Sequence, residues 1–395
     1  MEGLSATEVA RQRLFSSKVR HLGEEVQYGS VNERPHDSPV VRALAEVVLP
    51  ARKLDATLAF FTGLGFTLES TFPAEAPVVA VVVGFGLRLR LDATATGAPG
   101  HVILSRDGPR ADVLVAPNGT RVELRPLWAP VVLPPLAPSY VLARLEDDAS
   151  WTVGRAGMRY RDLIPDRQGG RVIASHIRVG DDGDVADYVH YHRVRFQMIF
   201  CYRGWTRLLY EDQGPAFVMS AGECVLQPPE IRHRVLACGP GTEVVEIGCP
   251  ALHETFADPS LALPTASRAP DREFFGQKFM FHDRTTAHWE PSGLPGFAAR
   301  DLGIARATRG LAAARILRNE RAAFGARRSH QGDLLFSFVT AGAATLVCEG
   351  QEPATVAPGD AFVIPPRVPF ALEGRSADLE LLEVTMPHEE ASRGA

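Results

Sequence analysis

Two histidines separated by a single residue are the side chains in this sequence best suited to chemistry. Residues 189–197 read VHYHRVRFQ, which places His190 and His192 in a run rich in valine, phenylalanine and tyrosine. That composition predicts a β-strand, and residues two apart on a strand point to the same face of the sheet. Imidazole is the commonest metal ligand among side chains and carries protons near neutral pH. We therefore expect the two rings to act together on one face.

A second stretch, residues 222–233, reads GECVLQPPEIRH and ends in a third histidine. The informative spacings run from His192 to Gln197 to Gly204, and from Gly222 to Pro228 to His233. Together with the histidine pair, these spacings resemble the two motifs of the cupin superfamily, whose members are glycine- and histidine-containing β-barrels that hold a metal ion.

The cupin resemblance implies one mononuclear metal centre with His190, His192 and His233 as ligands. It implies Gln197 either as a fourth ligand or as a residue that hydrogen-bonds a metal-bound molecule, and both readings stay open. Fe(II) is the expected metal, with Ni, Mn, Zn and Cu as alternatives, because imidazole-rich sites with open positions suit all of them. Cupins usually have glutamate at the position of Gln197. The amide removes one negative charge, so the divalent ion should favour an anionic, chelating substrate such as an enolate, a catecholate or a hydroxycarboxylate.

Strand alternation predicts further residues of the pocket. If Gln197 points inward, Ile199 and Cys201 do too, and Cys201 is then either part of an apolar wall or a thiol with a chemical role. His176 and Arg178 alternate on the preceding strand pattern IASHIRV. On the inner face, Arg178 would bind a substrate carboxylate, because guanidinium binds carboxylates through two hydrogen bonds. The alternative is a surface pair on an edge strand.

Three residues in or beyond the last part of the first motif could act as general acids or bases. They are Tyr202, Glu211 and Asp212. The local sequence YEDQG reads more simply as a polar turn between strands.

The second part of the chain contains an internal repeat with an offset of about 138 residues. Residues 160–179 resemble residues 299–318, and the glycines and prolines of both motifs recur at this offset. We therefore predict two tandem barrels, a bicupin. The second copy replaces the residues of the candidate site, with Arg328, His330, Leu335 and Phe370 in place of His190, His192, Gln197 and His233. One histidine cannot close a metal shell, so we expect the second barrel to be structural or to shape a pocket.

The region before the barrels predicts a small α+β domain, with a helix over 54–66 and a hairpin turn at Asn118-Gly119. The helix ending FFTGLGF and the closing APNGTRVELRP resemble the vicinal-oxygen-chelate fold of glyoxalases and bleomycin-resistance proteins. That family's metal ligands correspond here to Glu46 and Glu123, with His101 as a further candidate. The second half is short for its usual helix, so the alternative is a truncated domain kept for packing or dimerisation.

The predicted fold is mainly β: two tandem cupin (double-stranded β-helix, jelly-roll) barrels preceded by a small vicinal-oxygen-chelate-like α+β domain. The predicted order is an N-terminal arm (1–41), the α+β domain (42–127), a Pro-rich linker (128–150), the first barrel with the metal site (151–255), a connector (256–295) and the second, degenerate barrel (296–390).

Composition limits the partners. The chain has 395 residues, is 45% hydrophobic and 23% charged, and carries a formal net charge of −5, so no basic field favours nucleic acid or an anionic membrane. No stretch approaches the ~20 apolar residues of a membrane span. The first thirty residues lack the apolar core of a signal peptide. The five cysteines show no CxxC spacing, and a cytoplasmic protein with reduced thiols is the expectation.

The function expected from this site is that of a non-haem Fe(II) dioxygenase that uses O2 to cleave a C–C bond of a small anionic aromatic or enolisable substrate. The architecture resembles that of three-histidine dioxygenases of the gentisate dioxygenase group. One alternative uses the same metal without O2, as an isomerase, lyase or decarboxylase. Another is a non-catalytic bicupin that binds a small ligand. Barrels of this type often pair through their sheets, so we expect a homodimer.

Overall fold

The computed structural model describes residues 44–108, 112–145, 151–320 and 326–387. The chain divides between Trp128 and Ala129 into two units. Most of the regular structure is β-strand, as the sequence predicts. None of the helices in these residues is long and apolar enough to cross a membrane.

The first unit begins with a strand, a helix and three further strands. The sheet order is β1-β4-β3-β2, with β1 parallel to β4. Helix α2 places Leu54 and Phe61 in one core with Leu89 and Leu91 of β4. The helix ends at Gly65, whose φ of 112° lies in the left-handed region that favours glycine. The elements are β1 (Val47–Pro50), α2 (Leu54–Leu64), β2 (Thr67–Phe72), β3 (Val79–Gly84) and β4 (Leu87–Asp92).

Three more strands of the first unit repeat part of this order without the helix. They are β5 (His101–Arg106), β6 (Asp112–Val115) and β7 (Arg121–Pro126), in the order β5-β7-β6 with β5 parallel to β7. The predicted hairpin at Asn118 and Gly119 joins β6 to β7. The described residues between β5 and β6 form no helix. The resemblance of this unit to the vicinal-oxygen-chelate fold remains a prediction.

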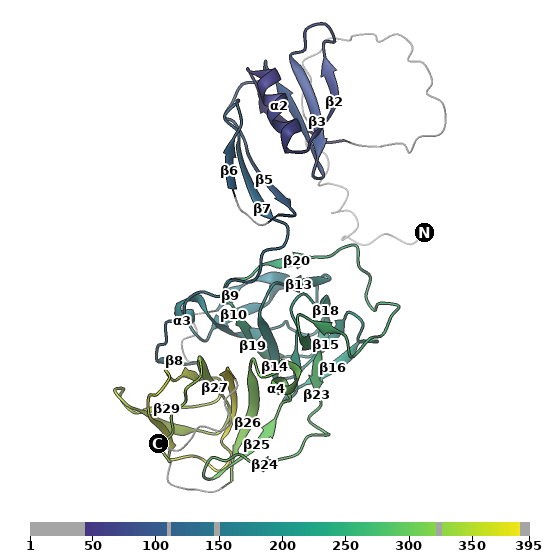
Figure 1. Ribbon diagram of the computed structural model, residues 1–395. Helices are drawn as coiled ribbons and strands as arrows, with labels where there is room; N and C mark the ends of the chain where they lie inside the picture. The colour runs from purple at the N-terminus through teal and green to yellow at the C-terminus, as the bar shows by residue number, and fades with distance from the viewer. Residues whose placement is uncertain (1–43, 109–111, 146–150, 321–325, 388–395) are drawn as a thin grey trace, which may run out of the picture. The chain divides into compact units, whose positions relative to one another are not determined.

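The second unit contains two β-barrels in tandem (Figure 1). In the first barrel a seven-stranded sheet, β23-β17-β14-β19-β11-β10-β9, packs face to face with the sheet β16-β15-β18-β13-β20. Its elements are β9 (Thr152–Val153), η2 (Arg155–Gly157), β10 (Arg159–Asp162), α3 (Arg167–Gly170), β11 (Ile173–Arg178), β12 (Gly183–Asp184), β13 (His190–His192), β14 (Phe196–Arg203), β15 (Trp205–Tyr210), β16 (Phe217–Ser220), β17 (Cys224–Leu226), β18 (His233–Cys238), β19 (Glu243–Cys249), β20 (Thr255–Ala257), β21 (Glu273–Phe274), β22 (Gln277–Lys278) and β23 (Met280–His282).

The second barrel repeats the same strand order, which agrees with the predicted repeat. Its seven-stranded sheet is β24-β25-β26-β32-β27-β30-β8, and its smaller sheet is β29-β28-β31. Its elements are β24 (Glu290–Pro291), β25 (Phe297–Asp301), α4 (Ile304–Ala307), β26 (Ala313–Asn319), β27 (Leu334–Ala341), β28 (Ala344–Cys348), β29 (Ala354–Val356), β30 (Ala361–Val363), β31 (Phe370–Glu373) and β32 (Glu380–Met386).

One strand of the second barrel comes from the segment expected to be a linker. Strand β8 (Val141–Ala143) pairs with β30, so a piece of chain that precedes the first barrel completes a sheet of the second. Strand β23, from the expected connector, pairs in turn with β17 of the first barrel. Proline-rich composition indicated loops and could not show that unpaired sheet edges were available to these segments.

Both barrels contain a bulge at the same place, and a glycine follows each. The register shifts between Cys201 and Arg203 in the first barrel and between Val339 and Ala341 in the second. Gly204, just beyond the first bulge, has a φ of +69°. A Cβ there would lie 2.9 Å from the Cα of Thr242. No other residue fits this turn without movement of the backbone, which explains the recurrent glycine of the repeat.

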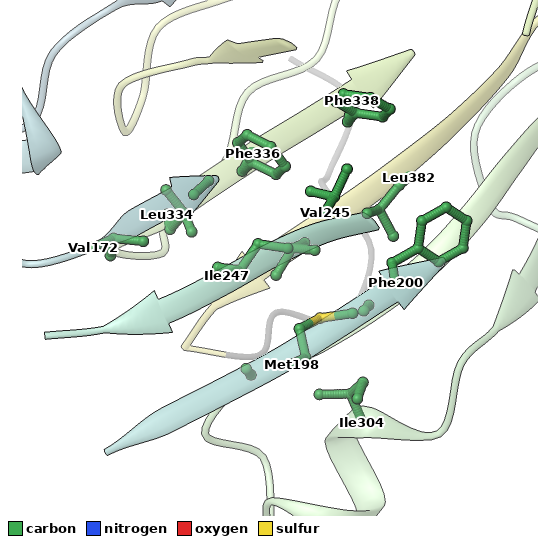
Figure 2. Close-up of a cluster of buried hydrophobic side chains, with 14 of the residues drawn as sticks. Val172, Met198, Phe200, Val245, Ile247, Ile304, Leu334, Phe336, Phe338 and Leu382 are labelled. Atoms are coloured by element: carbon green, nitrogen blue, oxygen red, sulfur yellow. The ribbon is translucent and has the colours of Figure 1, made fainter. Parts of the chain in front are cut away.

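The two seven-stranded sheets pack against each other through one apolar core. Met198 and Phe200 of β14 meet Phe336 and Phe338 of β27, with Ile247 between them (Figure 2). All five side chains are at most 2% exposed. Alternation along each strand therefore sends one set of side chains into this inter-barrel core and the other set into the interior of its own barrel.

A buried arginine adds polar contacts between the barrels. Arg161 of β10 is 1% exposed and donates to the carbonyls of Arg144 (2.7 Å) and Gly359, which belongs to the second barrel. It also donates to Nδ1 of His176, at 3.1 Å. One guanidinium thus satisfies acceptors from three separate segments.

Replacement of this arginine should weaken the whole second unit. Arg161→Ala leaves two buried acceptors and one partly buried carbonyl without this donor, and we expect it to lower the free energy of unfolding by about 3–5 kcal/mol. Arg159→Ala, an exposed position on the same strand, should cost less than about 0.5 kcal/mol. Urea unfolding measures both, and equal losses would contradict the assigned role of Arg161.

Candidate metal centre

Three histidines of the first barrel meet at the pairing of β13 with β18. His190 lies directly opposite His233 in this antiparallel pair, and His192 lies two residues further along β13. The ring centroids of His190 and His233 are 4.2 Å apart, and that of His192 lies 5.1 Å and 5.3 Å from them. One ring nitrogen of each lies within 4.8 Å of the others. In the described part of the chain, no other group of three or more His, Cys, Asp or Glu side chains has this geometry.

Each of the three rings has a hydrogen-bond partner at Nδ1, which fixes its orientation. Nδ1 of His190 donates to the carbonyl of Tyr188 (2.8 Å), and Nδ1 of His233 donates to that of Ile231 (3.0 Å). Nδ1 of His192 lies 2.9 Å from the hydroxyl of Thr255 on β20. A carbonyl can only accept, so the contacts of His190 and His233 place the proton on Nδ1 and leave Nε2 with its lone pair. A hydroxyl donates or accepts, so the contact of His192 with Thr255 is compatible with either tautomer.

The ring nitrogens that remain fit a metal ion. Nε2 of His190 is buried and has no hydrogen-bond partner within the described structure, an arrangement that costs free energy unless a ligand completes it. One ring nitrogen from each of the three histidines lies within 4.8 Å of the others, and three imidazole nitrogens are a donor set that Fe(II) and its divalent neighbours accept. The residues present therefore fit the metal that the sequence predicts.

Burial keeps these imidazoles neutral, the form that binds metal. Desolvation and the neighbouring His190 lower the pKa of His192 to about 2. Desolvation also lowers the pKa of His233 well below its ordinary value. The pKa of His190 is lowered by desolvation and by Arg155, and Asp187 acts against this shift.

A buried carboxylate lies behind His190. Oδ1 of Asp187 is 3.7 Å from Nδ1 of His190, and its side chain is fully buried. Asp187 accepts hydrogen bonds from Arg155 and from the backbone N–H of Val235, the latter at 2.9 Å. A carboxylate behind a ligating histidine raises its basicity and fixes its orientation. The sequence analysis missed Asp187, since no spacing rule distinguishes it from the other acids of its loop.

The neighbours of Gln197 alternate as predicted. Ile199 and Cys201 pack into the interior of the first barrel, whereas Met198 and Phe200 enter the inter-barrel core. Nε2 of Gln197 donates to Oε1 of an interior carboxylate, Glu246, at 3.1 Å.

Cys201 forms part of the apolar wall. Burial raises the pKa of its thiol to about 12, so the thiolate needed for nucleophilic or ligand chemistry is not formed near neutral pH. Of the two readings of Cys201 from sequence, this environment favours the apolar wall.

The structure places His176 and Arg178 on the other face of their strand. Ile177 between them packs into the barrel interior, and His176 contacts Phe338 of the second barrel. Nε2 of His176 bonds Glu243 at 2.8 Å, and Arg178 lies over the ring of Trp151. The structure therefore does not bring Arg178 to the three histidines, and its binding of a substrate carboxylate stays a prediction. Sequence gives the period of a strand, but not which phase faces inward.

The other candidate acids and bases also lie away from the histidines. Tyr202 faces the inter-barrel core beside Phe338. Glu211 and Asp212 form ion pairs with Arg272, both at 2.7 Å, in the turn that YEDQG predicts.

Further polar residues that sequence reasoning missed are close to the histidines or face the same interior. Tyr210 stacks on His233 with an interplanar angle of 22°, and its buried hydroxyl has no partner within the described structure. His253 lies 5.5 Å from His192 between ring centroids, and its Nδ1 bonds the carbonyl of Pro250. Gln227, which is 1% exposed, has neither amide atom paired within the described residues.

The second barrel holds an ion pair where the first holds histidines. Arg328 lies opposite Phe370, as His190 lies opposite His233. Arg328 donates to the fully buried Glu383. Nε2 of His330 bonds the carbonyl of Ile364 at 2.7 Å. The described residues of this barrel form no metal-ligand group.

The ligand candidates of the first unit bind arginines instead. Glu46 pairs with Arg88 at 2.8 Å. Glu123 pairs with Arg125 at 2.8 Å and lies 3.5 Å from His101. Among the described residues these three side chains do not form a metal-ligand group.

We predict that metal-free protein loses stability in mild acid. The unfolded chain protonates His192 near its ordinary pKa of 6.5, whereas the folded chain keeps it neutral. Stability is therefore complete above about pH 6.5 and falls below it, by up to about 1.4 kcal/mol per pH unit for each such histidine. Urea unfolding at pH 7.5, 6.5 and 5.5 should show a shallower decline in His192→Asn. Identical slopes would contradict the assignment.

Glu46→Ala should change neither metal content nor turnover, because Glu46 already pairs with Arg88 and Arg90 and belongs to no metal-ligand group among the described residues. Elemental analysis checks this, and the loss of one metal equivalent would overturn the reading of the first unit.

Comparison with known proteins gives one family match and several similar folds. Residues 319–385, which lie in the second barrel, match the cupin domain model. No curated protein matches the chain. Oxalate decarboxylase from Bacillus subtilis is 12% identical, with a TM-score of 0.48 over 67% of this chain and 79% of that one. A salicylate 1,2-dioxygenase variant from Pseudoaminobacter salicylatoxidans, in complex with gentisate, is 15% identical, with a TM-score of 0.49 over 65% and 84%. The protein Ylba from E. coli is 10% identical, with a TM-score of 0.46 over 65% and 94%.

Proposed function

We propose that the first barrel binds one divalent metal ion through Nε2 of His190, His192 and His233, and that the protein is a metal-dependent enzyme. The observation that carries the proposal is the convergence of three neutral imidazoles whose Nδ1 atoms are already hydrogen-bonded. Fe(II) is the proposed native ion, and Mn, Ni, Zn and Cu accept the same donors.

The charge of the site selects the substrate. Three imidazoles and an amide supply no negative charge, so a divalent ion would keep its full charge toward the open positions. The metal would act as a Lewis acid and as the point where an anionic, chelating substrate and O2 meet. Tyr210 stacks on His233, and ring contacts continue from Tyr210 to Phe279, Phe217 and Phe281, which gives aromatic surface that a flat ring could pack against.

We propose on this basis a dioxygenase that cleaves a C–C bond of a small anionic aromatic or enolisable substrate. Gln227 supports this assignment, since its unpaired amide offers one donor and one acceptor to a hydroxyl or carboxylate of the ligand. Unpaired buried amides are costly, and a polar ligand would remove that cost.

A second candidate is metal-dependent proton transfer without O2, as in an isomerase, lyase or decarboxylase. One observation favours it: Glu246 accepts a hydrogen bond from Gln197 inside the same barrel, and a carboxylate there could act as a general base. A bicupin that binds a small ligand without turnover is a third outcome of the experiment below.

The test is metal loading of untagged protein under anaerobic conditions, followed by O2 uptake with hydroxylated aromatic acids and β-dicarbonyls. About one iron per chain with substrate-dependent O2 uptake would support the dioxygenase. Product formation without O2 uptake would favour proton transfer. Metal-dependent ligand binding without turnover would favour the third outcome, and no metal after loading would refute the proposal.

His192→Ala should remove most bound metal and all turnover, because two imidazoles hold a divalent ion weakly. His330→Ala, the equivalent change in the second barrel, is the matched control, since His330 bonds a carbonyl and no metal ligand lies beside it in the described structure. Elemental analysis of both variants after identical loading gives the comparison. Equal metal loss would contradict the assignment of the site to the first barrel.

A further inference from the structure

Glu246 is a carboxylate that faces the interior of the first barrel. It lies on β19 between Ser175 of β11 and Ile199 of β14. Its neighbours along the strand, Val245 and Ile247, pack into the inter-barrel core, so alternation turns Glu246 to the interior. There its negative charge reaches Tyr210, which stacks on His233, and contributes to the raised pKa of that hydroxyl.

The hydrogen bond between Gln197 and Glu246 determines which end of the Gln197 amide could approach a cation. Nε2 of Gln197 lies 3.1 Å from Oε1 of Glu246. An ionised carboxylate only accepts hydrogen bonds, so the amide nitrogen must face it. The oxygen of Gln197, the end that can approach a cation, is thereby directed away from Glu246. Rotation of the amide would place two acceptors against each other.

Glu246 has no cationic partner within the described residues. It forms no ion pair with an arginine, lysine or histidine there. Glu246 is partly exposed, and a carboxylate that loses part of its hydration is favoured where positive charge or hydrogen bonds compensate that loss.

In the second barrel, arginine side chains compensate the charge of the glutamate at the equivalent position. Glu383 lies between Arg315 and Ser337 in the register that Glu246 occupies between Ser175 and Ile199. It is fully buried and bonded by two guanidinium groups, those of Arg315 (2.7 Å) and Arg328.

The position of Arg328 can be compared directly with that of His190 in the first barrel. It lies opposite Phe370, at the place where His190 lies opposite His233 in the first barrel. The barrel that has lost its histidines therefore places a side-chain cation where the other has its candidate metal site. In both barrels an interior glutamate accompanies this position.

We propose that Glu246 is the counter-charge of the metal site. It orients the amide oxygen of Gln197 toward the ion and supplies, one hydrogen bond away, the negative charge that an amide in place of the usual carboxylate removes. This inference rests on the proposed metal site and assigns Glu246 as a positioning residue. Such partners of a ligand commonly change metal affinity by about 10–100-fold.

Co(II) is the probe for the test, because its affinity and its visible spectrum both report the ligand set. Glu246→Gln keeps the size of the side chain and removes its charge, and we expect Co(II) to bind about 10–100-fold more weakly. The double variant Gln197→Glu with Glu246→Gln moves the carboxylate to the neighbouring strand. It should recover affinity to within about threefold of the unaltered protein and change the Co(II) spectrum, since the carboxylate can now bind directly.

Glu243→Gln is the matched control. It makes the same exchange on the same strand, but Glu243 bonds His176 on the opposite face. We expect it to lower thermal stability and to leave Co(II) affinity within about twofold. This separates loss of fold from loss of charge at the site.

Two results overturn the inference in distinguishable ways. If the unaltered protein binds one Co(II) and Glu246→Gln binds it equally well with the same spectrum, Glu246 is not the counter-charge, and the proposed function stands. If the unaltered protein binds no Co(II), the inference fails together with the proposed function. Should Glu246→Gln fold poorly, a folded double variant that binds Co(II) weakly would also overturn it.

Discussion

The antiparallel pairing of β13 with β18 is the contact on which the candidate site depends. It places His190 opposite His233, and the flanking strand β20 brings Thr255 to His192. His190 and His233 each bond the carbonyl two residues before it in the chain, so the same local turn orients both rings. A slip of one residue in this pairing would turn a histidine to the outer face of the sheet and separate the three Nε2 atoms.

The two barrels differ in the groups that compensate the negative charge of an interior glutamate. Each has a glutamate on the interior face of a central strand, Glu246 in one and Glu383 in the other. In the second barrel arginine side chains neutralise it and the apolar core closes around Phe370. In the first barrel Glu246 accepts a hydrogen bond from the uncharged amide of Gln197, and three uncharged imidazoles converge in the same barrel. In the second barrel the compensating charge comes from arginine side chains, whereas in the first the proposed metal ion would supply it.

Sequence alone predicted the parts of this arrangement that depend on spacing. The histidine spacing predicted one shared strand face, and the repeat predicted two barrels with the site in one of them. Alternation placed Ile199 and Cys201 in the interior, because the motif fixed the phase of that strand. No motif fixed the phase of the strand that carries His176 and Arg178. In the structure His176 contacts Phe338 of the second barrel, and Arg178 lies over the ring of Trp151. Glu246 was missed because its relation to Gln197 exists only through the register of β14 with β19. The pairing of β8 with the second barrel was missed for the same reason, since sheet edges are a property of the folded chain.

X-ray absorption at the metal edge, on untagged protein loaded to saturation, tests the central claim most directly. The account predicts about one metal ion per chain, bound by nitrogen and oxygen donors that include three imidazoles. It predicts no sulfur ligand, because the five cysteines are buried away from the site or held as protonated thiols. A second equivalent of bound metal, a sulfur ligand, or fewer than three imidazoles would contradict it.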